Sequence, residues 1–394
     1  MKLAKVQKRV LFAVNELDFF LSHRSEIANS LSMEGCDVTV VALWHSGFIK
    51  PSATLRSNIK IILCRDSVGI SATSVFTIFG KLKQTINEIS PNLIYLISPI
   101  MHLLFGLFIR NSQITRVFVF AGLGRAFGRS WLGRVVYPFV WIFYKVALNT
   151  DRRFAIFQKK EDYEFIQKTF SVRFDKVAII PGSGVSKHFF RVNSAKEKIR
   201  VGMASRLLIE KGVLDFIQAA TLVQRTYPEI EFVLAGQMDK GWGSGLNNFL
   251  ISRALKNSSV RYVGVVSEMH VFLNSLSMFV YPSNYMEGIP KVLLEAAACG
   301  VPIIASDKPG CRDVVGRSNQ DCLAVVGNVC DLRDKIIYLL DRPKRMLKIS
   351  MDNAERANEL YRVEDVVESF IKFNDSLLET GFECEKQEDG IDCA

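Results

Sequence analysis

The chain has 394 residues, of which 49% are apolar and 23% are charged. This is the composition of a globular protein; it excludes a largely disordered chain, and the length suggests two domains at about 100–200 residues each. The net charge of +10 is uneven, because residues 1–185 carry 24 Lys and Arg against 12 Asp and Glu, whereas residues 186–394 carry 26 against 28. A basic first half indicates a polyanionic partner, either an anionic membrane or a nucleic acid, or else a solvated basic surface.

The cysteines and the N-terminus bear on the compartment. None of the eight cysteines forms a C-x-x-C pair, so neither a zinc site nor a redox motif is indicated. The basic start is followed by a short apolar run without a small-residue cleavage site, and we interpret it as a first strand rather than a signal peptide. We therefore expect reduced thiols in a cytoplasmic protein.

Along the first half, short apolar runs alternate with helical stretches. The predicted strands are residues 9–15, 37–43, 59–63, 93–97, 116–120, 154–157 and 176–180. A helix is predicted over residues 22–33. Short buried strands between helices favour a parallel sheet covered on both faces.

Residues 89–109 carry no charge and are long enough to span a bilayer. They also contain Pro91, Asn92, Pro99 and His102, which are unusual in a membrane span. We therefore predict a strand over 93–97 and a short helix over 100–109.

The pattern starts again after the turn-rich residues 181–184. Further strands are predicted at residues 200–204, 231–235, 278–281 and 301–305, with a helix at 213–226. We predict an α/β protein of two doubly wound, Rossmann-like domains that face each other across a cleft, where such sheets usually bind ligands. The predicted parts are a first domain (1–184), a second domain (185–362), a final helix (363–379) that packs back toward the first domain, and a flexible tail (380–394).

The most informative segment is residues 287–300, which read EGIPKVLLEAAACG. Pro290 fits the first position of a helix, and Gly300 fits the residue just past its end. The free backbone N–H groups of such a helix start favour a bound phosphate. Glu287 precedes this helix, and Glu295 lies more than one turn inside it.

These residues resemble the signature E-G-x-P-x-x-x-L-E-A-x-A-x-G of family-four glycosyltransferases, which are retaining enzymes of the GT-B fold. The resemblance implies that Glu287 contacts hydroxyls of the donor sugar and that Glu295 contacts the ribose. Carboxylates suit this role because they accept short, charge-assisted hydrogen bonds from hydroxyls. The other predicted donor-binding residues of this segment are Gly288, Ile289, Pro290, Lys291 and Val292.

A second segment, residues 204–212, resembles another motif of the same family, in which an arginine is followed by four residues and then by Lys-Gly. The resemblance implies that Arg206 and Lys211 clamp the nucleotide diphosphate and stabilise the charge it gains as the sugar leaves. With Glu287, they are the predicted catalytic residues. No Asp-x-Asp occurs in the chain, so we expect no metal and no cofactor, with the two cations and the helix start in the metal's place.

Residues 19–24 and 121–124 resemble a narrower bacterial group that adds sugars to undecaprenyl-diphosphate-linked glycans for O-antigen, capsule or protein glycosylation. His23 and Arg24 are predicted to open a helix where an anion can bind, although a plain helix start fits equally well. With Gly122 and Gly124 they are the candidate acceptor-binding residues.

The stretch from 125 to 148 mixes cations with aromatic residues, which suits an anionic membrane surface. The alternative is that these aromatics pack into the core of the first domain. His102 is interpreted as a packing residue beside an apolar helix, and no catalytic histidine is assigned.

The sequence thus predicts a retaining, metal-independent hexosyltransferase. It would move a hexose or N-acetylhexosamine from a UDP-sugar to a polyprenyl-diphosphate-linked acceptor glycan in O-antigen, capsule or related polysaccharide synthesis. We expect it in the cytoplasm, attached peripherally to the inner face of the cell membrane. The alternatives are a GT-B sugar-nucleotide epimerase, which needs catalytic acids and no acceptor, and a non-catalytic membrane- or nucleic-acid-binding module. No recognised nucleic-acid motif in the sequence supports the nucleic-acid-binding module.

Overall fold

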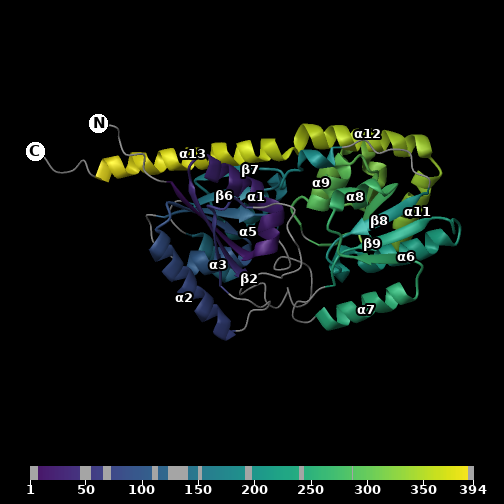
Figure 1. The fold of residues 1–394 in the computed structure, drawn as a ribbon, viewed down its shortest axis with the longest axis horizontal. Helices are drawn as coiled ribbons and strands as arrows, with labels where there is room; N and C mark the ends of the chain where they lie inside the picture. Colours follow the sequence, from purple (N-terminus) through teal and green to yellow (C-terminus); the bar gives the residue numbers. More distant parts are fainter. Residues whose placement is uncertain are drawn as a thin grey trace, which may run out of the picture. The chain divides into compact units, whose positions relative to one another are not determined.

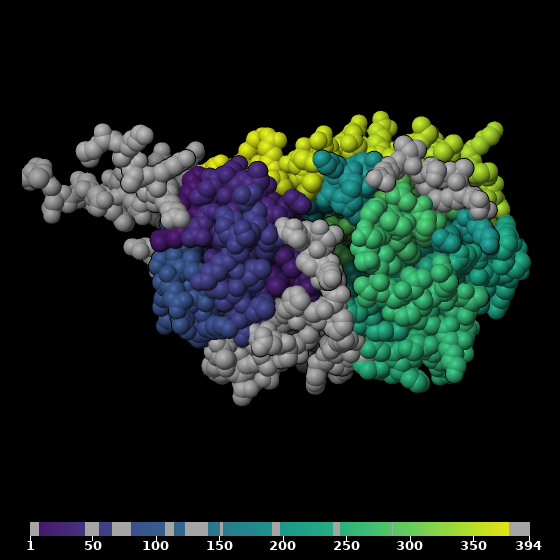
Figure 2. Space-filling view, viewed as in Figure 1, coloured from purple at the N-terminus to yellow at the C-terminus, as the bar shows by residue number. Residues whose placement is uncertain are grey.

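The structure is a computed structural model that describes residues 8–44, 55–64, 72–108, 114–122, 141–149, 153–190, 198–238, 244–285 and 287–388. The chain forms two compact units. The first comprises Met1–Pro181 with Glu364–Ala394, and the second comprises Gly182–Val363 (Figure 1). Figure 2 shows the same chain in a space-filling view, with the first described residues in purple and blue and most of the second unit in green.

The first unit is built on a parallel sheet of seven strands in the order β3-β2-β1-β4-β5-β6-β7. The strands are β1 (Arg9–Glu16), β2 (Asp37–Trp44), β3 (Lys60–Leu63), β4 (Leu93–Ile97), β5 (Thr115–Phe120), β6 (Arg153–Phe157) and β7 (Lys176–Ile179). Every residue of β4 and β5 is buried, as expected for central strands covered on both faces. The strand order reverses between β1 and β4, which makes the sheet doubly wound.

Helices accompany this sheet. They are α1 (Leu17–Met33), α2 (Ala72–Ile89), α3 (Pro99–Phe108), α5 (Lys160–Phe170) and α13 (Val363–Glu388), and residues 141–148 are also helical. The uncharged stretch 89–109 is divided between β4 and α3, as predicted. Within the described part of the chain, no helix is long and apolar enough to cross a membrane.

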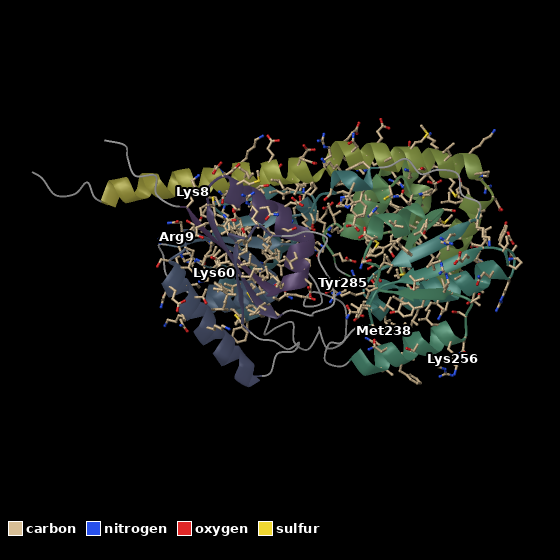
Figure 3. All side chains as sticks on the ribbon, viewed as in Figure 1. Lys8, Arg9, Lys60, Met238, Lys256 and Tyr285 are labelled. Atoms are coloured by element: carbon tan, nitrogen blue, oxygen red, sulfur yellow. The ribbon has the colours of Figure 1, made fainter. Side chains whose placement is uncertain are left out.

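The C-terminal helix α13 belongs to the core of the first unit (Figure 1). The ring of Phe370 lies 4.7 Å from that of Tyr95 in β4, which in turn stacks on Phe12 of β1 at 5.0 Å. Lys8, labelled in Figure 3, pairs with Asp375 of α13 at 3.1 Å. The helix continues to Glu388, so residues 380–388 are helical and do not belong to the flexible tail predicted from residue 380.

The second unit contains a parallel sheet of six strands in the order β10-β9-β8-β11-β12-β13. The strands are β8 (Arg200–Ala204), β9 (Glu231–Ala235), β10 (Arg261–Gly264), β11 (Met278–Tyr281), β12 (Ile303–Ser306) and β13 (Leu323–Ala324). The α-helices are α6 (Val213–Gln224), α7 (Ser244–Lys256), α8 (Met269–Asn274), α9 (Lys291–Ala298), α10 (Pro309–Val315), α11 (Val329–Leu340) and α12 (Pro343–Leu360). Short 3-10 helices are η2 (Lys187–Phe189), η3 (Ile209–Lys211) and η4 (Arg317–Cys322). The strand order reverses between β8 and β11, and this switch point determines where the candidate site lies.

Candidate active site

The candidate site lies where β8 and β11 end, at the switch point of the second sheet. Ligands of doubly wound sheets bind beyond the carboxyl ends of the strands at this point, because the connections on either side run to opposite faces. The segment after β8 carries Arg206 and Lys211, and the segment after β11 carries Glu287. The sheet topology therefore brings together residues that are far apart in the sequence.

Lys211 is the last residue of η3 and is almost completely buried. Its Nζ atom lies 2.6 Å from Oε2 of Glu287 and donates to the hydroxyl of Tyr281 at 3.0 Å. The ring of Tyr285, labelled in Figure 3, faces the same ammonium at 4.9 Å. Gly212 follows with φ +77°, and a Cβ there would lie 2.1 Å from the carbonyl oxygen of Pro282. Glycine thus lets the Lys211 turn pack directly on the segment after β11.

The carboxylate of Glu287 is held from several sides. Its Oε1 accepts hydrogen bonds from the hydroxyls of Tyr281, at 2.6 Å, and Ser283, at 3.0 Å, while Oε2 faces Lys211. The Ser283 hydroxyl also accepts the backbone N–H of Tyr285 at 3.2 Å, which fixes its own orientation. Glu287 is therefore an oriented carboxylate and not a freely moving loop side chain.

Burial and charge act together on this pair. Burial raises the pKa of Glu287, but the positive charge of Lys211 and the hydrogen bonds from Lys211, Tyr281 and Ser283 outweigh it and leave the pKa lowered. Burial lowers the pKa of Lys211, an effect that Glu287 opposes and nearby Arg206 reinforces. The environment of the pair therefore favours an ionised carboxylate.

Glu295 lies in the second turn of α9 and is also buried. Lys291, on the preceding turn, approaches Oε1 of Glu295 at 3.4 Å. Burial raises the pKa of Glu295, and the charge and hydrogen bond of Lys291 offset this only in part. A carboxylate that costs free energy to ionise in the folded protein is more typical of a functional site than of a structural ion pair.

Arg206 differs from the other donor-site residues because its side chain is exposed. Its backbone carbonyl accepts from the Ser205 hydroxyl and the Leu208 N–H, both at 2.9 Å, so the segment after β8 is fixed while the guanidinium faces solvent. The charge of Arg206 is among the influences that lower the pKa of Lys211.

The helix start at α9 differs in one detail from expectation. Pro290 precedes the first helical residue, Lys291, and has extended ψ 119°, so it is the N-cap and not the first helical position. The carbonyl of Pro290 accepts the N–H groups of Leu293 and Leu294. Gly288 and Ile289 are buried on the approach to the helix, and Val292 is half-buried in its first turn.

The turn that carries Gly288 is tightly packed. A Cβ on Gly310 of α10 would lie 1.8 Å from the Gly288 carbonyl, so glycine is required there. At the other end of α9, Gly300 has φ +64° directly after the helix, as predicted.

The acceptor residues are placed differently from the prediction. Helix α1 begins at Leu17, directly after β1, so His23 and Arg24 lie in its second turn and do not open it. The predicted anion site at a helix start is therefore wrong for these two residues. Ser22, the first residue of the predicted helix, donates its hydroxyl to the carbonyl of Phe19 within α1, at 3.1 Å.

The surroundings of His23 and Arg24 are those of packed helix residues. His23 stacks on Phe19 with ring centroids 4.2 Å apart, and its Nδ1 lies 2.7 Å from the Ser22 hydroxyl. Arg24 is buried, which lowers its pKa to about 10. Gly122 follows β5 with φ +117°, and Gly124 lies outside the described residues.

His102 is a core residue, as its sequence context indicated. It is fully buried, its Nδ1 hydrogen-bonds the Tyr144 hydroxyl, and its Nε2 lies 2.9 Å from the carbonyl of Leu96. Burial lowers its pKa to about 3, so the ring is neutral in the folded protein.

The aromatic and basic stretch 125–148 is described only from residue 141. In that part, Tyr144 is buried in the core, whereas Ile142 and Phe143 are about half exposed, at 53% and 51%. The end of this stretch therefore combines core packing with an exposed apolar surface.

Two points remain about the candidate site: whether its residues could hold a metal ion, and which of its residues the sequence did not predict. In the part of the chain that the structure describes, no cluster of three or more His, Cys, Asp or Glu side chains is arranged to hold a metal ion. Tyr281 and Ser283 were not predicted as site residues. Tyr281 ends an apolar strand and so has the sequence pattern of a core residue, and only its hydroxyl group distinguishes it.

Two parallel doubly wound α/β units define the chain as a two-domain protein of the GT-B type. The solved structure of sucrose-phosphate synthase from Thermosynechococcus elongatus has a TM-score of 0.78 at 15% identity and is aligned over 95% of this chain and 100% of its own. The Anabaena protein HepE, solved in complex with UDP-glucose, has a TM-score of 0.70 at 15% identity, with 93% of this chain and 99% of that chain covered. At such low identities these structures show the fold alone.

The sequence comparisons relate the second unit to a family of enzymes. Residues 185–356, which make up nearly all of the second unit, match the family described as glycosyl transferases group 1. The N,N'-diacetylbacillosaminyl-diphospho-undecaprenol alpha-1,3-N-acetylgalactosaminyltransferase of Campylobacter jejuni is 29% identical over 249 residues. That match covers 60% of this chain and 63% of the relative, which is less than two thirds of its length. The match to the group 1 glycosyl transferases therefore covers the second unit, which carries the candidate site.

Proposed function

We propose that this protein is a retaining glycosyltransferase that moves a hexose or N-acetylhexosamine from a UDP-sugar to a polyprenyl-diphosphate-linked glycan. The observation that carries the proposal is the contact between Lys211 and Glu287 at the switch point of the second sheet, within the segment that matches the family. A buried cation can bind the diphosphate of a sugar nucleotide, and an oriented carboxylate beside it can accept hydrogen bonds from the sugar hydroxyls.

The donor would be held by four groups in the second unit. Arg206, Lys211 and the first N–H groups of α9 bind the diphosphate, because cations and helix starts both favour anions. Glu287 accepts hydrogen bonds from the sugar hydroxyls, and Glu295 accepts them from the ribose. Gly288 adds no Cβ to the turn before α9, where a phosphate would approach the helix start.

The reaction would proceed on one face of the sugar. The bond between the anomeric carbon and the phosphate oxygen breaks, the acceptor hydroxyl oxygen bonds to the same carbon, and its proton passes to the leaving phosphate oxygen. The anomeric configuration is thereby retained. Lys211 and Arg206 stabilise the negative charge that the diphosphate gains, which is the role of a metal ion in other transferases, so we propose that the reaction requires none.

The acceptor proposal is supported by the Campylobacter relative, whose name includes a diphospho-undecaprenol substrate. It is consistent with synthesis of an O-antigen, capsule or related polysaccharide. A lipid-linked acceptor requires contact with a membrane, and residues 125–148 combine Arg and Lys with aromatics and include the exposed Ile142 and Phe143. Each Lys or Arg near an anionic leaflet contributes about 1 kcal/mol, so several would hold the protein peripherally at the inner face of the cell membrane.

Nucleotide binding tests the donor half of this proposal. Calorimetry with UDP, GDP and ADP in the presence of EDTA would be performed on the wild type, on Glu295→Ala, and on Glu355→Ala, which removes an exposed glutamate from α12. We expect UDP to bind in EDTA, the Glu295 variant to bind about 10- to 100-fold more weakly, and the Glu355 variant to match the wild type. Absence of nucleotide binding to the wild type would refute the proposed function. Unchanged UDP affinity in the Glu295 variant would refute the proposed contact of Glu295 with the ribose.

A further inference from the structure

A single phenol hydroxyl lies between the two opposite charges of the candidate donor site. The hydroxyl of Tyr281 donates to Oε1 of Glu287 at 2.6 Å and accepts from Nζ of Lys211 at 3.0 Å. A carboxylate can only accept and an ammonium can only donate, so these directions are fixed by the chemistry of the two partners. Tyr281 is thus the link between the cation assigned to the diphosphate and the carboxylate assigned to the sugar.

The hydroxyl is suited to this role because it keeps its proton. Burial, together with the adjacent Glu287, raises the pKa of Tyr281 well above its ordinary value. The side chain is 1% exposed, and the residue ends β11, a fully buried strand beside β8. A group held by a central strand is positioned more rigidly than one carried by a loop.

Ser283 supports the same oxygen from the other side. Its hydroxyl donates to Oε1 of Glu287 at 3.0 Å and is itself fixed by the N–H of Tyr285. Oε1 therefore takes two hydroxyl hydrogen bonds, while Oε2 faces Lys211. If a diphosphate draws Lys211 away, Glu287 loses its ion pair but keeps both hydroxyl donors.

We propose that Tyr281, assisted by Ser283, is a positioning residue that keeps the Glu287 carboxylate ionised and oriented toward the donor sugar while Lys211 binds the diphosphate. This inference rests on the proposed function, since it names the residues that prepare the same donor site. Neither hydroxyl is required to contact the donor itself. The effect that the two hydroxyls share is on Glu287, so it appears more strongly in recognition of the sugar than in recognition of the nucleotide.

The loss of UDP-sugar affinity at low pH, which is called the acid limb below, reports directly on this effect. Both hydroxyl hydrogen bonds help to lower the pKa of Glu287, so removing either must raise that pKa. The other groups that bear on the cluster are Lys211 and Arg206 from the segment after β8 and Cys311 of α10, which acts on Lys211 and Tyr281. All three remain in the hydroxyl variants, so a shift of the acid limb reports on the missing hydrogen bond.

The test compares Tyr281→Phe and Ser283→Ala with Tyr227→Phe. Tyr227, which follows α6, also donates its hydroxyl to a carboxylate, that of Asp341, so it controls for loss of such a bond elsewhere in the unit. Affinities for UDP and for UDP-glucose, UDP-N-acetylglucosamine and UDP-N-acetylgalactosamine would be measured by calorimetry across pH. The UDP-sugar that binds the wild type most tightly then serves as the probe.

We expect Ser283→Ala to bind UDP like the wild type, and Tyr281→Phe, which also loses the acceptor for Lys211, to weaken UDP binding less than probe binding. Both variants should bind the probe about 10- to 100-fold more weakly, the loss expected for a hydrogen bond to a charged group. Their probe affinity should also begin to fall at a higher pH, and Tyr227→Phe should follow the wild type in both respects. Equal losses for UDP and the probe, or an unshifted acid limb, would overturn the positioning role while leaving the proposed function intact. A wild type that binds no UDP-sugar would overturn the proposed function, and this inference with it.

Discussion

At the scale of single residues, Glu295 is a buried carboxylate whose ionisation costs stability. Its folded pKa is raised above the ordinary value of 4.5. At a pH between the ordinary pKa and the raised folded pKa, Glu295 keeps its proton in the folded protein but has lost it in the unfolded chain. The free energy of unfolding therefore falls as the pH rises from the ordinary to the folded pKa, and it stays lowered by the full amount at higher pH. Glu295→Gln should therefore raise the free energy of unfolding at neutral pH by about 0.5–2 kcal/mol, the range of single stabilising substitutions, while it weakens UDP binding.

Urea unfolding of this variant and the wild type at several pH values checks the expectation. The gain should vanish at a pH below the ordinary value, where the wild-type carboxyl is protonated in both states. Glu355→Gln, an exposed change on α12, should show no such pH dependence. A Glu295 variant that is less stable than the wild type at neutral pH would contradict the argument.

Lys211 and Glu287 depend on each other for stability. Lys211→Met leaves the Glu287 carboxylate, whose side chain is 20% exposed, without its cation, which should cost up to about 3–5 kcal/mol. Adding Glu287→Gln should recover most of that loss without restoring activity. Because Glu287 has a lowered folded pKa, its wild-type contribution is present above its ordinary value and is lost as the pH falls through the folded value.

Chemical denaturation of the single and double variants, with an activity assay, separates these effects. The exposed pair of Lys372 with Glu368 in α13 is the comparison, and Lys372→Met should cost less than about 1 kcal/mol. Additive losses in the double variant would show that the two site residues do not stabilise each other.

The family resemblance predicted that Lys211 and Glu287 belong to one site, because it ties both to the donor. It did not predict Tyr281 and Ser283, since their role arises only when strand β11 places their hydroxyls beside the carboxylate. A polar group at the end of a buried strand has no periodicity of its own. The hydroxyls of Tyr281 and Ser283 meet Glu287 only through the path of the loop after β11, which residue types and spacing do not encode.

At the scale of elements, central strands were predicted best. The predicted bounds of β4, β8, β9 and β11 are those of the structure, because these strands are continuous apolar runs buried on both faces. The short outer strands β10 and β13 gave no such signal and were missed, since β10 is half exposed and β13 has two residues. The start of α1 was misplaced because the chain passes from strand to helix at Glu16 without a side-chain cap.

The tight turn at Gly212 connects two of these elements and allows a test of their packing. Gly212→Ala combines a strained φ of +77° with a Cβ 2.1 Å from the Pro282 carbonyl, so the Lys211 turn must move away from β11. We expect a loss of about 1–3 kcal/mol in stability and weaker UDP binding.

Thermal unfolding and calorimetry would measure both effects. Gly245→Ala in α7 is the matched control, because its Cβ meets no atom within 4 Å, and it should change stability by no more than about 1 kcal/mol. Wild-type UDP affinity in the Gly212 variant would show that the close packing of these two segments does not position Lys211.

At the scale of the whole molecule, the two ends of the chain share one core. Helix α13, at the end of the sequence, contributes Val366, Phe370, Phe373 and Leu377 to the core that contains β1 and β4. The buried Asn374 accepts the Tyr95 hydroxyl at 3.1 Å and fixes the helix on the sheet. The donor residues all lie in the other unit, Gly182–Val363. Stability of the first unit and donor binding by the second should therefore be separable.

Phe370→Ala tests this separation. The side chain is 2% exposed and packs against the rings of Tyr95 and Phe12, so its removal should cost the first unit about 3–5 kcal/mol. Hydrogen exchange resolved by peptide should show faster exchange in β1 and β4, with the second unit and its UDP affinity unchanged. Phe249→Ala, at a 60% exposed position of α7, is the matched control and should cost less than about 0.5 kcal/mol. If UDP affinity falls together with the exchange protection of β1 and β4, donor binding depends on the first unit, and the two units do not act independently in forming the donor site.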